Sequence, residues 1–263
     1  MNTFSRAGTS LHYSISGNPD GQVLVFSNSL GTDFRIWDQV VARLPDSLRV
    51  VRYDKRGHGL SDVGQVPWGM ADHVSDLAGL LDHLDIRDAI VCGLSVGGMI
   101  TQGLAAERPE LVKAMILCDT GAKIGTPDMW QQRVETVHSA GIESMADAVM
   151  ERWFTSEFRE SDPTFPIWRN MLCRTTAEGY AGTCQAIADT DLIESTSRLR
   201  IPCLGICGDK DLATPPDLVR ETVSLVPGAM FELIRNAGHI PCVEQPEAMT
   251  SAIKAFLTDL QMI

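Results

Sequence analysis

The residue of this chain with the clearest chemical potential is a serine set between glycines. Residues 89–100 read AIVCGLSVGGMI, an apolar stretch that runs into Gly-x-Ser-x-Gly around Ser95 and then into residues suited to a helix. A sharp turn from strand to helix needs glycine at positions 93 and 97, because side chains there would collide with the adjoining strand and helix. The turn holds the serine hydroxyl at a helix N-terminus, whose unpaired N–H groups favour developing negative charge. The pattern predicts a nucleophile for acyl chemistry.

A serine hydroxyl attacks a carbonyl carbon efficiently only when a base removes its proton, and a carboxylate must hold that base in the right tautomer. Two of the six histidines, His138 and His239, follow Ser95 along the chain. His138 lies in a stretch of helical pattern, whereas His239 comes shortly after residues 231–236, FELIRN, which read as a strand. We therefore predict His239 as the base, and we expect structural roles for His12, His73, His83 and His138.

Two aspartates compete for the role of the carboxylate. Residues 208–215 read GDKDLATP and follow a segment that reads as a buried strand. Asp211 matches the arrangement Gly-x-x-Asp-x-x-x-Pro, whereas Asp209 suits a turn in which its side chain bonds nearby backbone. The prediction is Asp211, and Asp209 stays open as the alternative.

The tetrahedral intermediate of acyl transfer carries an oxyanion that needs two N–H donors. One donor is expected from Val96, the residue after the nucleophile. The other is expected from the loop Ser27–Gly31, which follows an apolar strand-like segment, with Ser29 as the donor. The function needs only a backbone N–H, so the side-chain types of Ser27 and Asn28 do not argue against catalysis.

The elements that must position these residues alternate along the chain. Short apolar runs alternate with longer segments of helical period such as residues 73–84, and this alternation is typical of a mainly parallel sheet covered by helices. A closing amphipathic helix is predicted over residues 247–260. The segments that read as strands are residues 11–17, 22–28, 49–54, 89–93, 113–119, 201–209 and 230–239.

The middle of the chain has a different character. From about Lys123 to Leu199 the sequence shows helical patterns, several aromatic residues and no convincing apolar strand. The strand pattern resumes at residue 201. We therefore expect a core made of residues 1–122 and 200–263, with residues 123–199 inserted as a helical cap over the active site.

Composition narrows the class of protein. The 263 residues are 44% hydrophobic and 21% charged, as in ordinary globular domains, and the formal net charge of −12 disfavours binding to nucleic acid or to an anionic membrane surface. No apolar run approaches the length of a membrane helix and no signal peptide is evident, so a cytoplasmic location is expected. The odd number of cysteines, seven, and their apolar settings argue against a disulfide framework, and their spacing gives no metal site.

Several longer segments resemble one family, the 3-oxoadipate enol-lactonases, and the similarity extends over essentially the whole chain. RYDKRGHGLSD at 52–62, GDKDLATPP at 208–216 and AGHIPCVEQPE at 237–247 accompany the nucleophile segment, and several of these motifs are general to the fold. The more specific segments are SNSLGTDFRIWDQV at 27–40, WFTSEF at 153–158 and GYAGTCQAIADTD at 179–191.

This resemblance implies the α/β-hydrolase fold, with a mostly parallel eight-stranded sheet flanked by helices. It also implies hydrolysis of 3-oxoadipate enol-lactone to 3-oxoadipate in bacterial breakdown of aromatic acids such as protocatechuate and catechol. The mechanism through an acyl-enzyme requires neither a metal nor an organic cofactor.

The implied substrate is a small anionic lactone, so an acidic protein must offer it a local cation. Arg133 is the candidate, because it lies three residues after Trp130 and shares a helix face with it. Trp153 is expected as an aromatic wall of the same cavity, although an aromatic residue in such a segment is often simply core. Asp54 and His58 are expected to brace loops.

Two other functions stay open. A general carboxylesterase or a carbon–carbon bond hydrolase would use the same triad on the same fold, and the cap would decide between them. A ligand receptor on a hydrolase scaffold would not need the complete set of catalytic residues, so their presence counts against it. Dehalogenase and epoxide hydrolase activities are disfavoured, because those relatives carry an aspartate at the position of Ser95.

Overall fold

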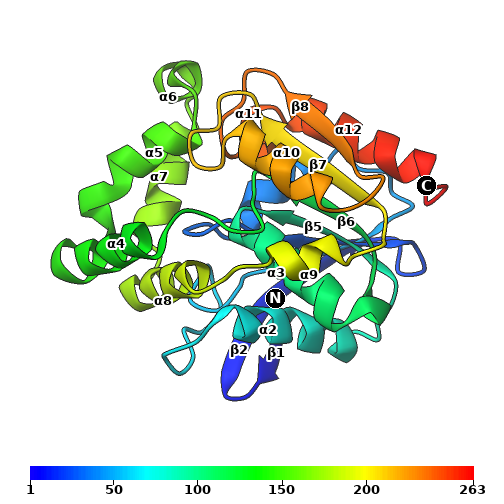
Figure 1. Ribbon diagram of the computed structural model, residues 1–263, viewed down its shortest axis with the longest axis horizontal. Coiled ribbons are helices and arrows are strands. Elements are labelled where there is room, and N and C mark those ends of the chain that lie inside the picture. Colours follow the sequence, from blue (N-terminus) through cyan, green and yellow to red (C-terminus); the bar gives the residue numbers. More distant parts are fainter.

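One sheet of eight strands, in the order β1-β2-β4-β3-β5-β6-β7-β8, organises the computed structural model, which describes residues 1–263 (Figure 1). β1 pairs with β2 and β2 with β4 in antiparallel fashion, and every other pair is parallel. The predicted mostly parallel, eight-stranded sheet is therefore confirmed. The strands are β1 (Asn2–Arg6), β2 (Thr9–Gly17), β3 (Val23–Ser27), β4 (Arg49–Tyr53), β5 (Ala89–Leu94), β6 (Val112–Cys118), β7 (Cys203–Gly208) and β8 (Met230–Ile234).

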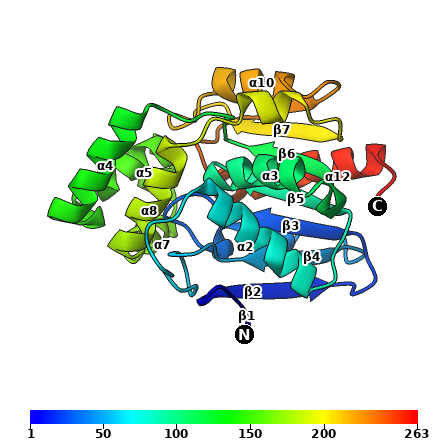
Figure 2. The ribbon, with the colours of Figure 1, turned by 60° about the horizontal axis from the view of Figure 1, so that its bottom comes forward.

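The central strands are nearly all apolar because helices cover both faces of the sheet. β3, β5 and β7 are buried at every position. Figure 2 shows α2 (Met70–His83) and α3 (Val96–Glu107) in front of the sheet, while α1 (Asp38–Val41) and α12 (Pro246–Asp259) pack together on the other face. The remaining helices near the sheet are η1 (Phe34–Trp37), η2 (Pro109–Leu111), α10 (Pro216–Ser224) and α11 (Pro241–Glu244).

Seven helices and no strand occupy the chain between β6 and β7. In Figure 1, α4 to α8 gather at one side of the molecule, whereas α9 packs against α3 beside the sheet. Trp130, Val137 and Trp153 from this segment belong to the same continuous hydrophobic core as the sheet. The helices are α4 (Pro127–Ala140), η3 (Ile142–Met145), α5 (Ala146–Trp153), α6 (Ser156–Ser161), α7 (Phe165–Cys173), α8 (Ala177–Ala188) and α9 (Ile193–Ser197).

Threonines set the starts of three of these helices. Thr126, Thr155 and Thr176 each accept a hydrogen bond from the backbone N–H three residues later, at the N-termini of α4, α6 and α8. Such caps satisfy N–H groups that have no partner inside the helix. At its other end α4 stops at Gly141, whose φ of 76° favours glycine. None of the helices combines the length and apolar character needed to cross a lipid bilayer.

The order of the strands creates the place for a site. β4 pairs with one side of β3 and β5 with the other, so the connections that leave β3 and β5 diverge at the carboxyl edge of the sheet. Open parallel sheets bind ligands in the crevice formed at such a reversal. Ser29 follows β3 and Ser95 follows β5, so the predicted nucleophile and oxyanion donor both lie at this crevice.

Candidate active site

The backbone around Ser95 has the strained form expected of a nucleophile turn. Ser95 lies between β5 and α3 with a φ of 58° and a ψ of −121°, a conformation that L-residues rarely adopt. A Cβ at Gly93 would lie 2.1 Å from the carbonyl oxygen of Gly97, and a Cβ at Gly97 would lie 2.1 Å from that of Ser27. Both glycines are therefore required by crowding, as the sequence predicted. The Ser95 N–H donates to the Cys118 carbonyl at 2.9 Å, which ties the turn to β6.

The structure brings Asp211 and His239 together at the ends of β7 and β8. His239 Nδ1 lies 2.9 Å from Asp211 Oδ2, and both side chains are buried. The other oxygen of Asp211 accepts from the backbone N–H groups of Ala213 at 2.7 Å and Thr214 at 3.1 Å. The carboxylate is thus fixed on both sides, and its bond to Nδ1 leaves Nε2 of the imidazole as the nitrogen available to a substrate or nucleophile.

Asp209, the alternative acid, lies in a different environment. Its Oδ1 accepts from the Ala237 N–H at 3.4 Å, and its Oδ2 lies 3.8 Å from an Arg235 nitrogen. Asp209 therefore braces the loop before His239, while Asp211 contacts the imidazole itself.

Thr214 is a polar partner that the sequence did not single out. Its hydroxyl donates to Asp211 Oδ2 at 2.7 Å and lies 3.2 Å from His239 Nδ1. A threonine three residues after an aspartate in a turn is a common local pairing, and that spacing was the available signal.

A second buried carboxyl lies beside the pair. Asp119 follows β6, its Oδ1 accepts from the Gly208 N–H at 2.9 Å, and its Oδ2 is buried without a partner. Polar atoms of Asp119, Asp211 and His239 lie within 4.8 Å of one another. Burial and then the charge of Asp211 raise the pKa of Asp119 well above its ordinary value.

Burial acts on Asp211 too, but it is outweighed there. Burial alone would raise the pKa of Asp211, whereas the charge and hydrogen bond of His239, with the bonds from Thr214 and Ala213, lower it below its ordinary value. The two neighbouring carboxyls are therefore shifted in opposite directions, so Asp211 is the ionised member.

The loop that carries His239 is anchored to the helical segment. The His239 N–H donates to the Trp153 carbonyl at 2.8 Å, at the end of α5. Glu244 accepts from the Gly238 N–H at 2.6 Å with one oxygen, and with the other from the Thr155 N–H at 2.9 Å and hydroxyl at 2.7 Å. These bonds hold the imidazole in place through two separate elements.

Two backbone N–H groups suit the predicted oxyanion hole. Val96 is the first residue of α3, and the N–H groups of the first helical turn have no partner inside the helix. The Ser29 N–H donates to no other protein group, and the Ser29 hydroxyl is also buried without a partner. Ser29 lines the same cavity as Ser95 and His239.

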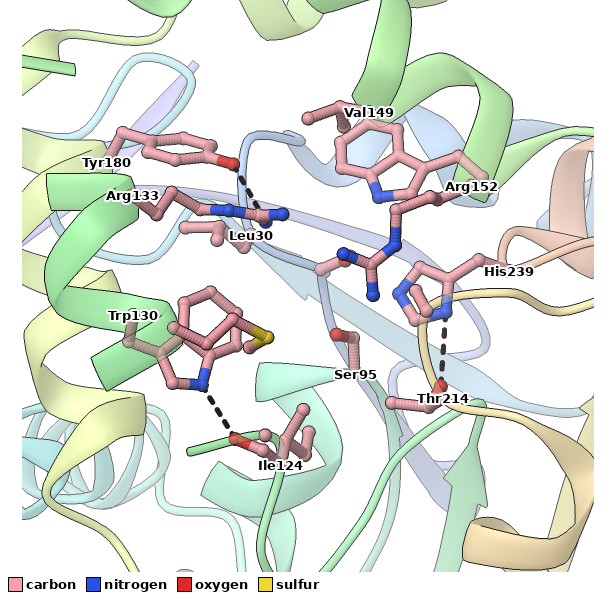
Figure 3. A pocket seen from close by; sticks show the side chains of 15 residues that line it. Leu30, Ser95, Ile124, Trp130, Arg133, Val149, Arg152, Tyr180, Thr214 and His239 are labelled. Carbon is pink, nitrogen blue, oxygen red and sulfur yellow. Dashed lines mark hydrogen bonds between the residues drawn. The ribbon is translucent and has the colours of Figure 1, made fainter. Parts of the chain in front are cut away.

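That cavity has a volume of about 80 Å³ and lies between the sheet edge and the helical segment (Figure 3). Trp130, Arg133 and Trp153, the predicted substrate-binding residues, all line it. The guanidinium of Arg133 stacks over Trp130 at 5.2 Å from the ring centroid, and Nη1 lies 3.5 Å from the Tyr180 hydroxyl. The Trp153 ring lies 6.5 Å from the His239 ring, and its backbone carbonyl holds the histidine loop.

Arg152 is a second cation in the cavity, and it was not predicted from the sequence. Its Nε donates to the Leu212 carbonyl at 3.3 Å. Figure 3 shows the Arg133 and Arg152 guanidinium groups both pointing into the cavity, with Arg152 on the side of Ser95 and His239. Burial and the charge of Arg133 lower the pKa of Arg152, which is the shift expected when two cations share a small enclosed space.

The residues expected to brace loops do so. Asp54 accepts from the Phe34 N–H at 2.9 Å and the Leu60 N–H at 3.0 Å, and its Oδ2 lies 2.8 Å from His12 Nδ1. His58 is buried, and its Nδ1 lies 3.1 Å from the Arg56 carbonyl. The side chains of Asp54, His12 and His58 do not line the cavity beside Ser95.

Comparisons of this chain with known proteins point to the same class of enzyme as the geometry of the site. The model of the alpha/beta hydrolase family matches residues 24–252. The 3-oxoadipate enol-lactonase 2 of Acinetobacter baylyi is 36% identical over 256 residues, which cover 97% of this chain and 96% of that protein. The crystal structure of the enol-lactonase from Burkholderia xenovorans has a TM-score of 0.94 and 38% identity, covering 98% of this chain and 100% of that one. A thermophilic esterase from Thermogutta terrifontis has a TM-score of 0.91 and 28% identity, covering 98% and 97%.

The fold and the strand-turn-helix around Ser95 define an α/β hydrolase. Within that class, the chain belongs to the family of the 3-oxoadipate enol-lactonases, and it is a lactone hydrolase. The predicted family, fold and enzyme class are confirmed.

Proposed function

We propose that this enzyme hydrolyses 3-oxoadipate enol-lactone to 3-oxoadipate, with Ser95 as nucleophile, His239 as base and Asp211 as the orienting carboxylate. The proposal also includes a cytoplasmic location and a role in the bacterial breakdown of aromatic acids. It further includes the division of the chain into a hydrolase core and a helical cap, the cap being residues 123–199. The relatives are named as enol-lactonases, which supports the proposed substrate. The contact between Asp211 and His239 supports their proposed roles as orienting carboxylate and base.

The observation that carries the proposal is the pair of uncompensated cations in the cavity. Neither Arg133 nor Arg152 forms an ion pair with an acidic side chain, although the protein has a formal net charge of −12. Two such guanidinium groups in a small cavity favour an anionic ligand. A lactone with a carboxylate side chain meets this requirement, whereas a neutral ester does not.

In the proposed acylation, Ser95 Oγ attacks the lactone carbonyl carbon while His239 Nε2 takes its proton. The N–H groups of Ser29 and Val96 hold the oxyanion. The bond between the carbonyl carbon and the ring oxygen then breaks, and the ring oxygen takes the proton from His239. The leaving oxygen is then an enol hydroxyl that remains tethered to the acyl group, because both belong to one molecule. Tautomerisation of this enol gives the ketone of 3-oxoadipate.

Deacylation uses the same residues in reverse roles. His239 takes a proton from water, the water oxygen attacks the acyl carbon, and the proton on His239 returns to Ser95 Oγ as the ester bond breaks. Hydrolysis of the acyl-enzyme creates a second carboxylate. Arg152 lies on the side of Ser95 in Figure 3, and we assign it to this new charge, while Arg133 binds the carboxylate already present.

The test is a comparison of three substrates. Purified protein is mixed with the enol-lactone, with p-nitrophenyl acetate and with a meta-cleavage product, and Ser95→Ala serves as the blank. We expect kcat/KM to be highest for the enol-lactone and all turnover to depend on Ser95. Preference for p-nitrophenyl acetate would indicate a general esterase, and preference for the meta-cleavage product a carbon–carbon bond hydrolase.

A further inference from the structure

A buried lysine lies behind the loop that contains Ser29. Lys55 follows β4, is only 1% exposed, and places its Nζ 2.5 Å from the Ser29 carbonyl oxygen and 3.5 Å from that of Thr32. β3 and β4 are parallel neighbours, so the loops that follow them lie side by side at the carboxyl edge of the sheet. The two carbonyls are the hydrogen-bond partners of this amine.

The surroundings give Lys55 no ion pair. Asp54 is already bonded to His12 and to two backbone N–H groups, and Asp33 is bonded to Arg35. Burial lowers the pKa of Lys55 to about 7, although the charges of Asp54 and Asp33 act in the other direction. An amine in such a site destabilises the fold more than an apolar side chain of the same size. Packing alone therefore does not explain a lysine here.

Ser29 is held from both sides. Its carbonyl accepts from Lys55 Nζ and also from the Thr32 hydroxyl at 2.9 Å and the Thr32 N–H at 3.3 Å. On the other side, the Asn28 side chain donates to the Tyr53 carbonyl at 3.0 Å and accepts from the Trp37 indole N–H at 3.1 Å. Only the backbone torsions φ and ψ of Ser29 lie between its N–H and its carbonyl. Because hydrogen bonds hold the Ser29 carbonyl on one side and Asn28 on the other, they also limit the direction of the Ser29 N–H.

We propose that Lys55 is a positioning residue for the oxyanion hole, acting through the Ser29 carbonyl to aim the Ser29 N–H at the developing oxyanion. This inference rests on the proposed role of Ser29. Lys55 lies outside the triad, and the inference gives its buried amine an effect on the transition state rather than on substrate binding. Such an effect appears in kcat and leaves KM nearly unchanged.

The test compares the wild type with Lys55→Met, which fills the same space without a donor. Loss of a whole oxyanion donor lowers kcat by about 10²- to 10³-fold, so misdirection of one donor should lower kcat by roughly 10- to 100-fold. The probes are a trifluoromethyl ketone, which forms a tetrahedral adduct on the serine, and 3-oxoadipate, which binds without forming a tetrahedral oxyanion on the serine. We expect the affinity for the ketone to fall by the same factor as kcat, and the affinity for 3-oxoadipate to stay within about twofold.

Thr32→Val provides a second and independent arm, because it removes another donor to the Ser29 carbonyl and leaves Lys55 in place. It should show the same selective loss to a smaller degree. The matched control is the double variant Arg56→Met with Asp76→Leu, which removes the neighbouring buried cation together with its partner, at 2.6 and 2.7 Å. Replacing both members of a buried pair is often tolerated, and this pair does not contact Ser29. Its kcat should match the wild type.

Unchanged kcat and ketone affinity in folded Lys55→Met would overturn the inference, and so would an equal loss of affinity for 3-oxoadipate. A wild-type enzyme that does not open the enol-lactone would instead contradict the proposed function. In that event the same comparison made with p-nitrophenyl acetate and the ketone still tests Lys55.

Discussion

In the proposed mechanism Ser95 and His239 act on a single proton, so their contributions to catalysis should not add. Ser95→Ala should fold normally and lose nearly all lactone turnover, because it removes the proposed nucleophile and leaves β5 and α3 intact. His239→Ala should be comparably damaging, and the double variant should be little worse than either single one. Steady-state turnover measures all three, with circular dichroism to check folding. Near-normal turnover in Ser95→Ala would contradict the whole assignment.

Substitutions of the two aspartates in the loop after β7 should have clearly different effects on turnover. Asp211→Asn leaves the packing unchanged but favours the wrong tautomer of His239, so turnover should fall by roughly 10⁴-fold at most. Asp209→Asn should have a far smaller effect, because Asp209 contacts the backbone of the loop and not the imidazole. Measuring kcat for both variants decides the matter, and a reversed order would assign the acid to Asp209.

Arg133 should set the preference for a charged substrate. Arg133→Ala should weaken use of the enol-lactone by about 1.5–3 kcal/mol, the range for a hydrogen bond to a charged group. In kcat/KM this is roughly a 10- to 150-fold loss. Hydrolysis of p-nitrophenyl acetate, which has no carboxylate, should change much less. Equal losses on both substrates would mean that Arg133 supports the structure of the helices, and no loss on either would mean that it does not touch the substrate.

Some residues of the site carry a sequence signal and others do not. Ser95, Asp211 and His239 each stand in a short motif at the end of a strand, so their positions follow from the chain itself. Arg152 lies near the end of an eight-residue helix, and an arginine on a short helix reads as a surface residue. Lys55 is similar, because a lysine in a loop normally faces water. Only the packing of distant segments shows that Lys55 is buried and that Arg152 is half-buried and lines the cavity.

At the scale of elements, Glu244 joins α11, the histidine loop and the start of α6 through its three hydrogen bonds. Glu244→Ala should leave the Gly238 and Thr155 N–H groups without their partner, which destabilises the protein by about 1–3 kcal/mol. Looser anchoring of His239 should also lower kcat. Glu247→Ala, an exposed change at the start of α12, is the control. Thermal unfolding and kcat check both variants, and equal behaviour of the two would contradict the anchoring role.

Helices and strands could be predicted from the sequence wherever one face of the element is buried, because burial gives a periodic pattern of apolar residues. The predicted helices at 73–84 and 247–260 correspond to α2 and α12, within a few residues at each end. β1 has no predicted counterpart, because it lies at the edge of the sheet with most of its residues exposed and so lacks a buried face. The strand order was not readable from any segment, since it depends on which neighbours each strand finds.

For the whole molecule, the sheet and the helical segment have different tasks. The carboxyl edge of the sheet supplies Ser29, Ser95, Asp211 and His239, while the helices between β6 and β7 supply both arginines and most of the aromatic wall. The proposed catalytic residues thus lie on the shared fold, and the substrate preference we propose resides on the helices between β6 and β7. The acidic surface and the cationic cavity together favour a small anion that can enter, over large polyanions that the overall field repels.

The stability of the whole molecule should depend on pH through Asp119. Burial and the neighbouring charge of Asp211 raise the folded pKa of Asp119 well above its ordinary value of 3.8. The folded protein therefore holds a proton that the unfolded chain releases. The contribution of Asp119 to stability is fully present below pH 3.8 and is lost as the pH rises through the folded pKa.

Asp119→Asn should remove this dependence. The asparagine oxygen can still accept from the Gly208 N–H, and its amide group replaces Oδ2, which has no partner. Because asparagine does not titrate, the free energy of unfolding of the variant should rise relative to the wild type as the pH increases from about 4 to about 8. Urea unfolding of both proteins at the two pH values measures this difference. A difference that stays constant over the range would mean that Asp119 is ionised in the folded protein, and that the negative charge beside His239 belongs to two carboxylates rather than to Asp211 alone.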